Sequence, residues 1–283
     1  MKHWYLVSAL AVVAASSVAA ADPKVRVEPA KVRPGDPVLV VVTNTDKPPV
    51  GTAGNTELQF FKAKTGYQAV FGMPLTGDYD EVTITVRGAA KPIKLKVTPH
   101  MFRDAKVAVE EELANPPAAD GEKIDADNKA MVAATRANGE PEFTRAFQGP
   151  RGKVTSVYGE WRTFNDGHRS QHLGFDVAAK VGTNVRAVNR GTVTFVGETL
   201  LGGNVVIIGH GAGIASVYMH LKDATVAQGD VVERGAEIGH SGETGRTTGP
   251  HLHVAVRVPG GFIDPQRFFK LKLMPAVVAN AKR

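Results

Sequence analysis

Short runs of β-branched and other apolar residues, separated by turn-forming residues, recur over residues 25–97. Residues 38–42 are an unbroken run of this kind, and Pro, Gly, Asn and Asp interrupt the chain between such runs. This regular spacing is typical of a small antiparallel sandwich. We therefore predict an Ig-like β-sandwich over residues 22–100, with strands around residues 25–27, 38–42, 58–61, 82–86 and 93–97.

The pattern changes between residues 101 and 149. The Pro- and Ala-rich residues 114–118 are typical of a linker, and residues 125–137 have the composition of a helix, which Gly139 is placed to end. The acidic residues of this segment lack a spacing that would favour a metal site, so we interpret them as surface charge. We predict that the segment joins two domains and packs against one of them.

Residues 150–270 return to short segments rich in Val and Gly, without a long stretch of helical periodicity. This pattern predicts a second domain of antiparallel β structure, followed by a C-terminal tail at residues 271–283. The whole chain is thus predicted to be mainly β. Strands are expected around residues 154, 157, 185, 193 and 196, and over residues 205–208, 215–221, 231–232 and 252–258.

The first 21 residues have the pattern of an export signal. Lys2 and His3 precede an almost unbroken apolar run over residues 4–13, and three alanines precede Asp22. The run is shorter than the roughly 20 residues of a membrane-spanning helix, which favours a cleaved signal over an anchor. We expect a protein of the periplasm or the extracellular envelope, without stable membrane insertion after cleavage.

Composition narrows the classes of function. Hydrophobic residues make up 43% of the chain and charged residues 22%, which excludes a wholly disordered or fibrous protein. The formal net charge of +6 favours an acidic partner such as nucleic acid, anionic lipid or an anionic cell wall. The chain has no cysteine, so disulfides and thiolate metal sites are excluded, and any metal must bind His, Asp or Glu.

Histidines are concentrated in the second β-rich region, which holds seven of the nine in the chain. Successive side chains of a strand point to opposite faces. If the segment around the first motif is a strand, His172 and Asp176 share one face, and the other face carries Leu173, Phe175 and Val177.

Two further segments alternate in the same way. His251 and His253 share one face of a predicted strand, whose other face carries Leu252, Val254 and Val256. His220 is expected on the face opposite Val217, Met219 and Leu221. Three strands therefore present polar residues from one face, and these faces could line one cleft.

An H-x3-D pair, an H-x-H pair and a third histidine favour a metal site over ordinary surface or core histidines. Zinc accepts imidazole nitrogen and carboxylate oxygen, and a hydrolytic zinc site keeps three protein ligands and a water. Such a centre lowers the pKa of the water and polarises a carbonyl. Two remaining histidines could then move a proton and stabilise the oxyanion.

Residues 150–268 resemble the lysostaphin-type (LytM-like) zinc metallopeptidase domain, whose members cut peptide bonds in peptidoglycan. Ser-Gln-His-Leu-Gly-Phe-Asp at 170–176 is similar to the first zinc motif of that family. Thr-Thr-Gly-Pro-His-Leu-His at 247–253 is similar to the last zinc motif, and Tyr-Met-His-Leu at 218–221 to the intervening histidine motif.

The resemblance implies a role for five residues. His172, Asp176 and His253 would be the ligands of one zinc ion per chain. His220 and His251 would be the catalytic pair that assists attack by a zinc-bound water, with the roles of general base and oxyanion stabiliser open between them. None of these positions is missing, which favours an enzyme over a degenerate relative.

Other candidates are weaker. We expect His168 in an exposed turn, His210 in a structural hydrogen bond and His240 in a loop, while Arg162 and Asn165 are less favoured as substrate contacts. The N-terminal region resembles the β domain that precedes the peptidase in some secreted bacterial members, on the evidence of its strand spacing and of Pro-Gly-Asp at 34–36.

The sequence therefore predicts an exported zinc endopeptidase that hydrolyses peptide bonds in peptidoglycan cross-links or stems. Its partners would be peptidoglycan peptides, with no nucleic acid, and the protein would be a monomer. One alternative is a non-catalytic wall-binding protein, or an activator of a cell-wall amidase, built on the same fold. Another is a zinc hydrolase that acts on proteins outside the wall.

Overall fold

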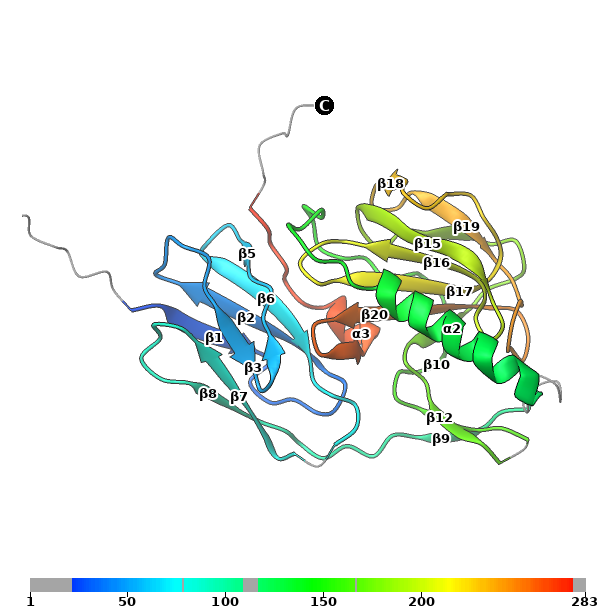
Figure 1. Ribbon diagram of the computed structural model, residues 1–283, viewed down its shortest axis with the longest axis horizontal. Coiled ribbons are helices and arrows are strands. Elements are labelled where there is room, and N and C mark those ends of the chain that lie inside the picture. Colours follow the sequence, from blue (N-terminus) through cyan, green and yellow to red (C-terminus); the bar gives the residue numbers. More distant parts are fainter. Residues whose placement is uncertain (1–21, 78, 109–116, 166, 277–283) are drawn as a thin grey trace, which may run out of the picture.

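The structure is a computed structural model that describes residues 22–77, 79–108, 117–165 and 167–276 (Figure 1). The predicted export signal at residues 1–21 lies outside the described residues, as do residues 114–116 of the predicted linker. Strands dominate the described chain, as the sequence predicts. Within the described ranges, no helix combines the length and the apolar character needed to cross a membrane.

Two four-stranded antiparallel sheets form the N-terminal region and enclose an apolar core between them. The β structure predicted here is confirmed, while its Ig-like character stays a prediction. The first sheet has the order β1 (Lys24–Glu28), β2 (Pro37–Thr43), β6 (Tyr67–Gly72) and β5 (Phe61–Lys62). The second has the order β4 (Thr56–Glu57), β3 (Gly51–Ala53), β7 (Glu81–Val86) and β8 (Ile93–Lys96).

The strand prediction was wrong at three places in this region. It had no strand at β3 and β4, it expected a strand at residues 58–60, which lie outside the strands, and it missed β6 altogether. All six residues of β6 are buried because the strand lies between β2 and β5 and is covered on both faces. A strand buried on both faces has no polar alternation to mark it.

One apolar core crosses from the N-terminal sheets into the C-terminal region. In β2, Val38 and Val40 point into the sandwich core, whereas Leu39 on the opposite face belongs to a second buried cluster. That cluster also contains Val258 and Ile263 of the C-terminal region, and β6 contacts both strands that carry them. The two regions therefore share buried apolar surface.

Ion pairs and the C-terminal segment reinforce this contact. Arg33 Nη2 lies 3.0 Å from Asp264 Oδ2, and Arg267 Nη1 lies 2.8 Å from the buried carboxylate of Asp36. Further along, the Ala276 amide donates to the Lys62 carbonyl, so the described part of the predicted tail runs beside β5 (Figure 1).

The predicted linker contains a strand and a longer helix than expected. β9 (Asp104–Lys106) pairs in parallel with β11 (Trp161–Thr163), and β12 (Arg169–Gln171) completes this small sheet. Helix α2 (Ala118–Ala134) begins directly after Pro117 and not at residue 125, because proline disfavours a helix only beyond its first turn. It ends before Gly139 and packs against the C-terminal sheet, as predicted.

A ten-stranded sheet, antiparallel in every pair, forms the C-terminal region and confirms the prediction of an antiparallel β fold. Two apolar clusters cover its faces, and α2 lies over one of them (Figure 1). A short helix, α3 (Pro265–Phe268), follows the last strand. The strands of the main path are β10 (Val154–Ser156), β13 (Phe175–Ala178), β20 (His251–Val258), β17 (Ala215–Ala224), β16 (Gly203–Gly209), β15 (Gly191–Thr199) and β18 (Val231–Val232). The others are β14 (Asn184–Arg186), β19 (Glu237–Ser241) and β21 (Gly261–Ile263).

Because the core is shared, we predict that the two regions unfold together. Leu39→Ala should lower the free energy of unfolding by about 2–5 kcal/mol, as for other buried leucines. Urea unfolding should be followed by far-UV circular dichroism and by the fluorescence of Trp161, which lies in the small sheet and is the one tryptophan beyond the predicted signal. Both midpoints should fall equally.

The control is Val50→Ala, since Val50 is 56% exposed and its loss should change the free energy by less than about 0.5 kcal/mol. In Leu39→Ala, an unchanged unfolding midpoint by Trp161 fluorescence together with a lower midpoint by circular dichroism would contradict a single cooperative unit.

Candidate metal centre

The pairing of β13 with β20 brings the two motifs of the sequence together. Asp176 stands opposite His253 in this antiparallel pair, and Ala178 stands opposite His251. In β20 the alternation is as predicted, since Leu252 and the valines that follow it at every second position point into the larger cluster. The two histidines of β20 therefore face the side on which α2 lies.

His172 reaches the same place from a bend and not from a strand. The chain turns at residues 173–174 between β12 and β13, and Leu173 is 41% exposed, so the predicted strand through this motif was wrong. Gly174 makes the bend compatible with the site, because a Cβ there would lie 2.6 Å from the ring of His253. Backbone hydrogen bonds of His172 with Gly159 and Glu160 hold it in place.

Three side-chain atoms converge at this point. His172 Nε2 lies 3.1 Å from Asp176 Oδ1, His253 Nδ1 lies 2.9 Å from the same oxygen, and the two nitrogens are 2.9 Å apart. All three residues are buried, and in the described part of the chain they are the one such group able to hold a metal. Ligands about 2.0–2.1 Å from a tetrahedral zinc lie about 3.3 Å from one another, so this donor set fits such an ion.

Protonation states also suit a metal. Burial lowers the pKa of His172 to about 4, although Asp176 opposes this effect. Burial raises the pKa of the Asp176 carboxyl, but its close contacts with the imidazoles of His172 and His253 outweigh burial and hold the pKa far below its usual range. At neutral pH the carboxylate is therefore ionised and the His172 ring is neutral, as metal ligands must be.

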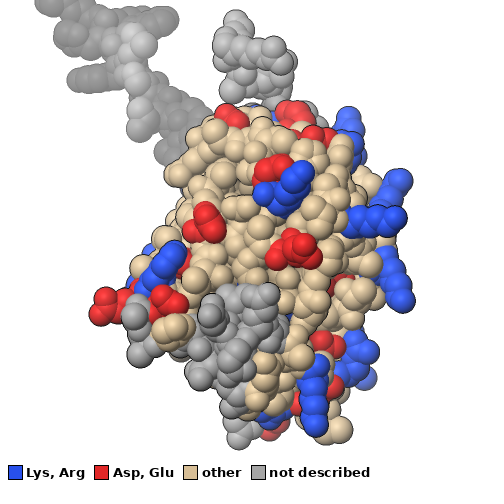
Figure 2. Space-filling view, turned by 90° about the vertical axis from the view of Figure 1, so that its right-hand side faces the viewer, with Lys and Arg blue, Asp and Glu red and all other residues tan. Residues whose placement is uncertain are grey.

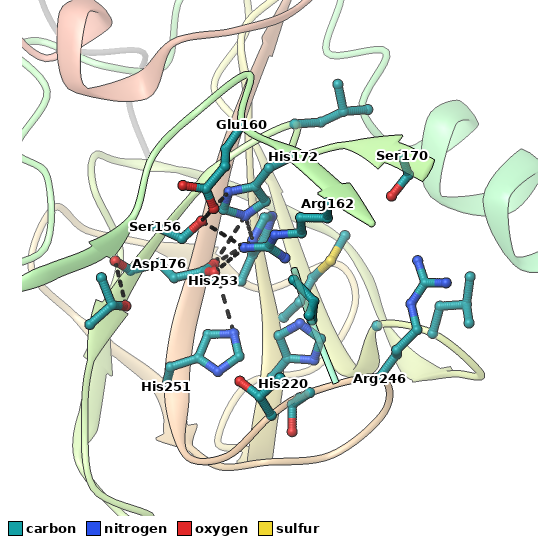
Figure 3. A pocket seen from close by; sticks show the side chains of 18 of the residues that line it. Ser156, Glu160, Arg162, Ser170, His172, Asp176, His220, Arg246, His251 and His253 are labelled. Atoms are coloured by element: carbon teal, nitrogen blue, oxygen red, sulfur yellow. Dashed lines mark hydrogen bonds and ion pairs between the residues drawn. The ribbon is translucent and has the colours of Figure 1, made fainter. Parts of the chain in front are cut away.

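Neighbouring polar groups orient these side chains. The Nδ1–H of His172 donates to the Val157 carbonyl at 3.0 Å, which turns the Nε2 lone pair toward Asp176. Arg162 Nη2 donates to Asp176 Oδ2 at 2.5 Å and to Ser156 Oγ at 2.9 Å (Figure 3). We had expected Arg162, if anything, at the substrate, and no motif in the sequence pointed to Ser156.

His220 and His251 lie beside this group. Their ring centroids are 4.8 Å apart, and that of His220 is 6.0 Å from that of His253. Nδ1 of His220 donates to the Thr244 carbonyl and Nδ1 of His251 to the Gly249 carbonyl, each at 2.8 Å. Each Nε2 is therefore the nitrogen left to act in the cavity, and that of His251 is buried without a hydrogen-bond partner among the described residues.

A bulge in β17 brings His220 to this side of the sheet. Met219 stands opposite His253 and lines the same cavity as His220, so the prediction that these two neighbours point to opposite faces was wrong. His220 has φ 61°, a left-handed conformation, and the pairing of β17 with β19 shifts register next to it. The following residue, Leu221, then lies in the same cluster as Tyr218.

Two interlocking loops support the His220 ring. The His220 amide donates to the Gly202 carbonyl, and the Arg246 amide donates to the Leu201 carbonyl. At Gly203, with φ 62°, a Cβ would lie 2.2 Å from Thr244 Oγ1, so the loops approach as closely as a glycine allows. The carbonyl that orients His220 is thus fixed by the backbone of a neighbouring loop.

All five residues singled out from the sequence line one cavity of about 610 Å³. Its walls include Phe164, which directly follows β11, Met131 of α2, and Val107 from the segment after β9. The side chains at its base point toward one another (Figure 3). The cavity is large enough for a short peptide segment.

The remaining histidines lie elsewhere. His210 is buried and bridges the Arg190 carbonyl and Ser216 Oγ, each at 2.8 Å, which is the structural role predicted for it. His168 is exposed, as predicted. The expectation of a loop at His240 was wrong, because this residue lies in β19 and pairs with Asp223 at 2.6 Å.

On the side of the molecule shown in Figure 2, charge does not mark a binding face. On the side shown in Figure 2, acidic and basic side chains are interspersed over the described residues, with several basic ones along one edge. The net charge of the chain therefore adds little to the evidence from the cavity.

Comparison with known proteins agrees with the resemblance of the region around the cavity to a metallopeptidase domain. The sequence profile of peptidase family M23 matches residues 170–265. The DD-carboxypeptidase/endopeptidase Mpg of Neisseria meningitidis serogroup B is 47% identical over 95 residues, which are 33% of this chain and 22% of that protein. The peptidoglycan DD-endopeptidase ShyA of Vibrio cholerae is 43% identical over 89 residues, 31% of this chain and 21% of that protein.

The fold has a counterpart over nearly the whole chain. A crystal structure of a candidate M23 peptidase from Pseudomonas aeruginosa matches with a TM-score of 0.66 and 24% identity, and the match covers 86% of this chain and 96% of that one. The matched profile contains all five residues that line the base of the cavity. Through the region that holds them, the chain belongs to peptidase family M23.

Proposed function

We propose that this chain is an exported zinc-dependent endopeptidase that hydrolyses peptide bonds in peptidoglycan. The observation that carries the proposal is the convergence of His172, Asp176 and His253, with their ligand atoms 2.9–3.1 Å apart, beside two further imidazoles in one cavity. The relatives named for DD-endopeptidase activity support the substrate class, although the match spans only about a fifth of their length.

The three converging residues are the ligands in this proposal, and zinc is the metal. Two imidazole nitrogens and one carboxylate oxygen are a common donor set of hydrolytic zinc sites. When bound, such an ion polarises a carbonyl and lowers the pKa of a water. Arg162 holds the second oxygen of Asp176, which leaves one oxygen of that carboxylate toward the histidines.

His220 and His251 accept and donate the proton that moves during hydrolysis. Because the Nδ1–H of each ring donates to a backbone carbonyl, each neutral ring presents an Nε2 lone pair that accepts a proton. A ring that has received the proton becomes an Nε2–H donor, which can then stabilise a developing oxyanion or protonate the leaving amine. His251 Nε2 lies 3.7 Å from Asp176 Oδ1, so its positive charge would be stabilised there.

The proposal predicts metal-dependent release of peptide fragments from purified peptidoglycan. Residues 22–283 should release them, a chelator should stop the release, and added zinc should restore it, since the ion supplies the electrophile. Mass spectrometry of the products identifies the bond that is cut. Casein, digested in parallel, is the control for a peptidase of general proteins.

Two outcomes would oppose the proposal. A metal-loaded protein that releases nothing from peptidoglycan would favour the alternative of a wall-binding or amidase-activating protein. Equal digestion of casein would favour a peptidase with targets outside the wall.

Two substitutions in the same cavity should separate binding of the metal from chemistry. Asp176→Ala should lose both metal and hydrolysis, because the carboxylate is a ligand in this proposal. His220→Ala should keep the metal, while turnover falls by about 100-fold or more, as expected for loss of an acid–base group. Elemental analysis of the purified variants and initial rates on peptidoglycan measure the two effects.

His168→Ala is the matched control, since this histidine is exposed and does not line the cavity. It should change neither measurement. Full metal occupancy in Asp176→Ala would refute the ligand assignment, and unchanged turnover in His220→Ala would remove that residue from the mechanism.

A further inference from the structure

The loop of residues 157–160, which connects β10 with β11, holds the proposed ligand His172 by backbone and by side chain. The Gly159 amide donates to the His172 carbonyl at 2.8 Å, and the His172 amide donates to the Glu160 carbonyl at 2.9 Å. The His172 ring donates from Nδ1 to the Val157 carbonyl of the same loop at 3.0 Å. The position and the rotation of this imidazole therefore depend on where the 157–160 loop lies.

Chain from outside the C-terminal region covers the other side of the 157–160 loop. The ring of Tyr158 is buried against Gly35 of the N-terminal region, where a Cβ would overlap it. The ring of Phe102 lies against Gly159 in the same way, since a Cβ at Gly159 would overlap that ring. Two successive residues of the loop thus pack directly on residues that precede the peptidase domain in the sequence.

The segment that carries Phe102 is itself attached on both sides. The ring of His100 meets that of Phe102 edge to face, with the centroids 4.7 Å apart, and His100 Nε2 lies 3.3 Å from Arg33 Nη1 of the N-terminal region. On the other side, the Trp161 amide donates to the Arg103 carbonyl at 2.8 Å. Phe102 therefore lies between the N-terminal region and the loop that holds His172.

We propose that Phe102 is a positioning residue for the metal site, and that through it the N-terminal region sets the affinity of this site for its metal. This inference rests on the proposed function and gives the N-terminal region a role in it. Residues 157–160 lie outside the strands, so packing and not a strand ladder must fix them. A ligand that is already oriented when the ion arrives binds it more tightly.

The glycine at position 159 makes this contact possible. Gly159 has φ 80°, a left-handed conformation that favours glycine, and the absence of a Cβ lets the Phe102 ring reach the backbone of the loop. Removal of the ring would leave a gap directly behind the two backbone hydrogen bonds of His172. The loop could then move into the gap and carry the imidazole away from Asp176 and His253.

The first test measures zinc affinity by competition with a chromogenic chelator. Phe102→Ala should bind zinc about 10-fold or more weakly than wild type, as when outer support of a ligand is lost. Phe102→Leu should give an intermediate affinity, because it keeps part of the contact with Gly159, and it decides the question if the alanine variant does not fold. Far-UV circular dichroism establishes which variants are folded.

Met101→Ala is the matched control. Met101 is the neighbour of Phe102 in the same segment, but it is 94% exposed. This variant should bind zinc as tightly as wild type. If folded Phe102 variants also bind zinc as tightly as wild type, the proposed role of Phe102 is wrong.

Hydrogen exchange in the metal-free protein separates this inference from the proposed function. In Phe102→Ala the amides of His172 and Gly159 should exchange about 10-fold or more faster than in wild type, while those of β16, in the centre of the large sheet, should change much less. Equal acceleration everywhere would mean a general loss of stability and would overturn the inference. If wild type binds no zinc, the proposed function fails, and the exchange rates still decide whether Phe102 positions His172.

Discussion

The candidate site depends first on the register of one pair of strands. Asp176 and His253 stand opposite each other in β13 and β20, in the interior of a ten-stranded sheet. A shift of one residue would turn His251 and His253 toward the larger apolar cluster and bring the leucine and valines of β20 out of it. Burial of those apolar side chains therefore fixes the register, and the fixed register keeps a carboxylate and an imidazole in contact. The chemistry follows from the packing on the other face of the same strand.

The other two imidazoles are held by backbone that departs from regular structure. His172 lies in a bend that Gly174 permits, and His220 lies in a bulge with a positive φ angle. Each of these departures turns an imidazole ring toward β20, whereas a straight strand would direct that ring elsewhere. Non-glycine residues with φ near 60° are uncommon and persist only where surrounding contacts hold them. Here the Gly202 carbonyl and the Thr244 carbonyl provide those contacts to His220.

Sequence patterns predicted the residues of the site better than the backbone that carries them. Alternation of apolar and polar residues identified β20 correctly, because one face of this strand packs in the core along its whole length. The same argument failed at Leu173 and at Met219, because a bend and a bulge each change the alternation by one residue and neither leaves a mark in the apolar pattern. It also missed β6, which is buried on both faces. Arg162 and Ser156 could not be connected to Asp176 from the sequence, since only the folded sheet brings them together.

The small sheet of β9, β11 and β12 connects the segment between the two regions with the site. β9 comes from that segment and pairs with β11, whose central residue, Arg162, contacts Asp176. The end of β12 leads directly into His172, which stands in contact with the same carboxylate. Three pieces of chain that precede the family match or begin it thus fix one side of the ligand group. Together with the shared core behind β20, this arrangement makes the orientation of Asp176 a property of the whole fold, so loss of the β9 pairing would loosen the site even where every one of its five residues is intact.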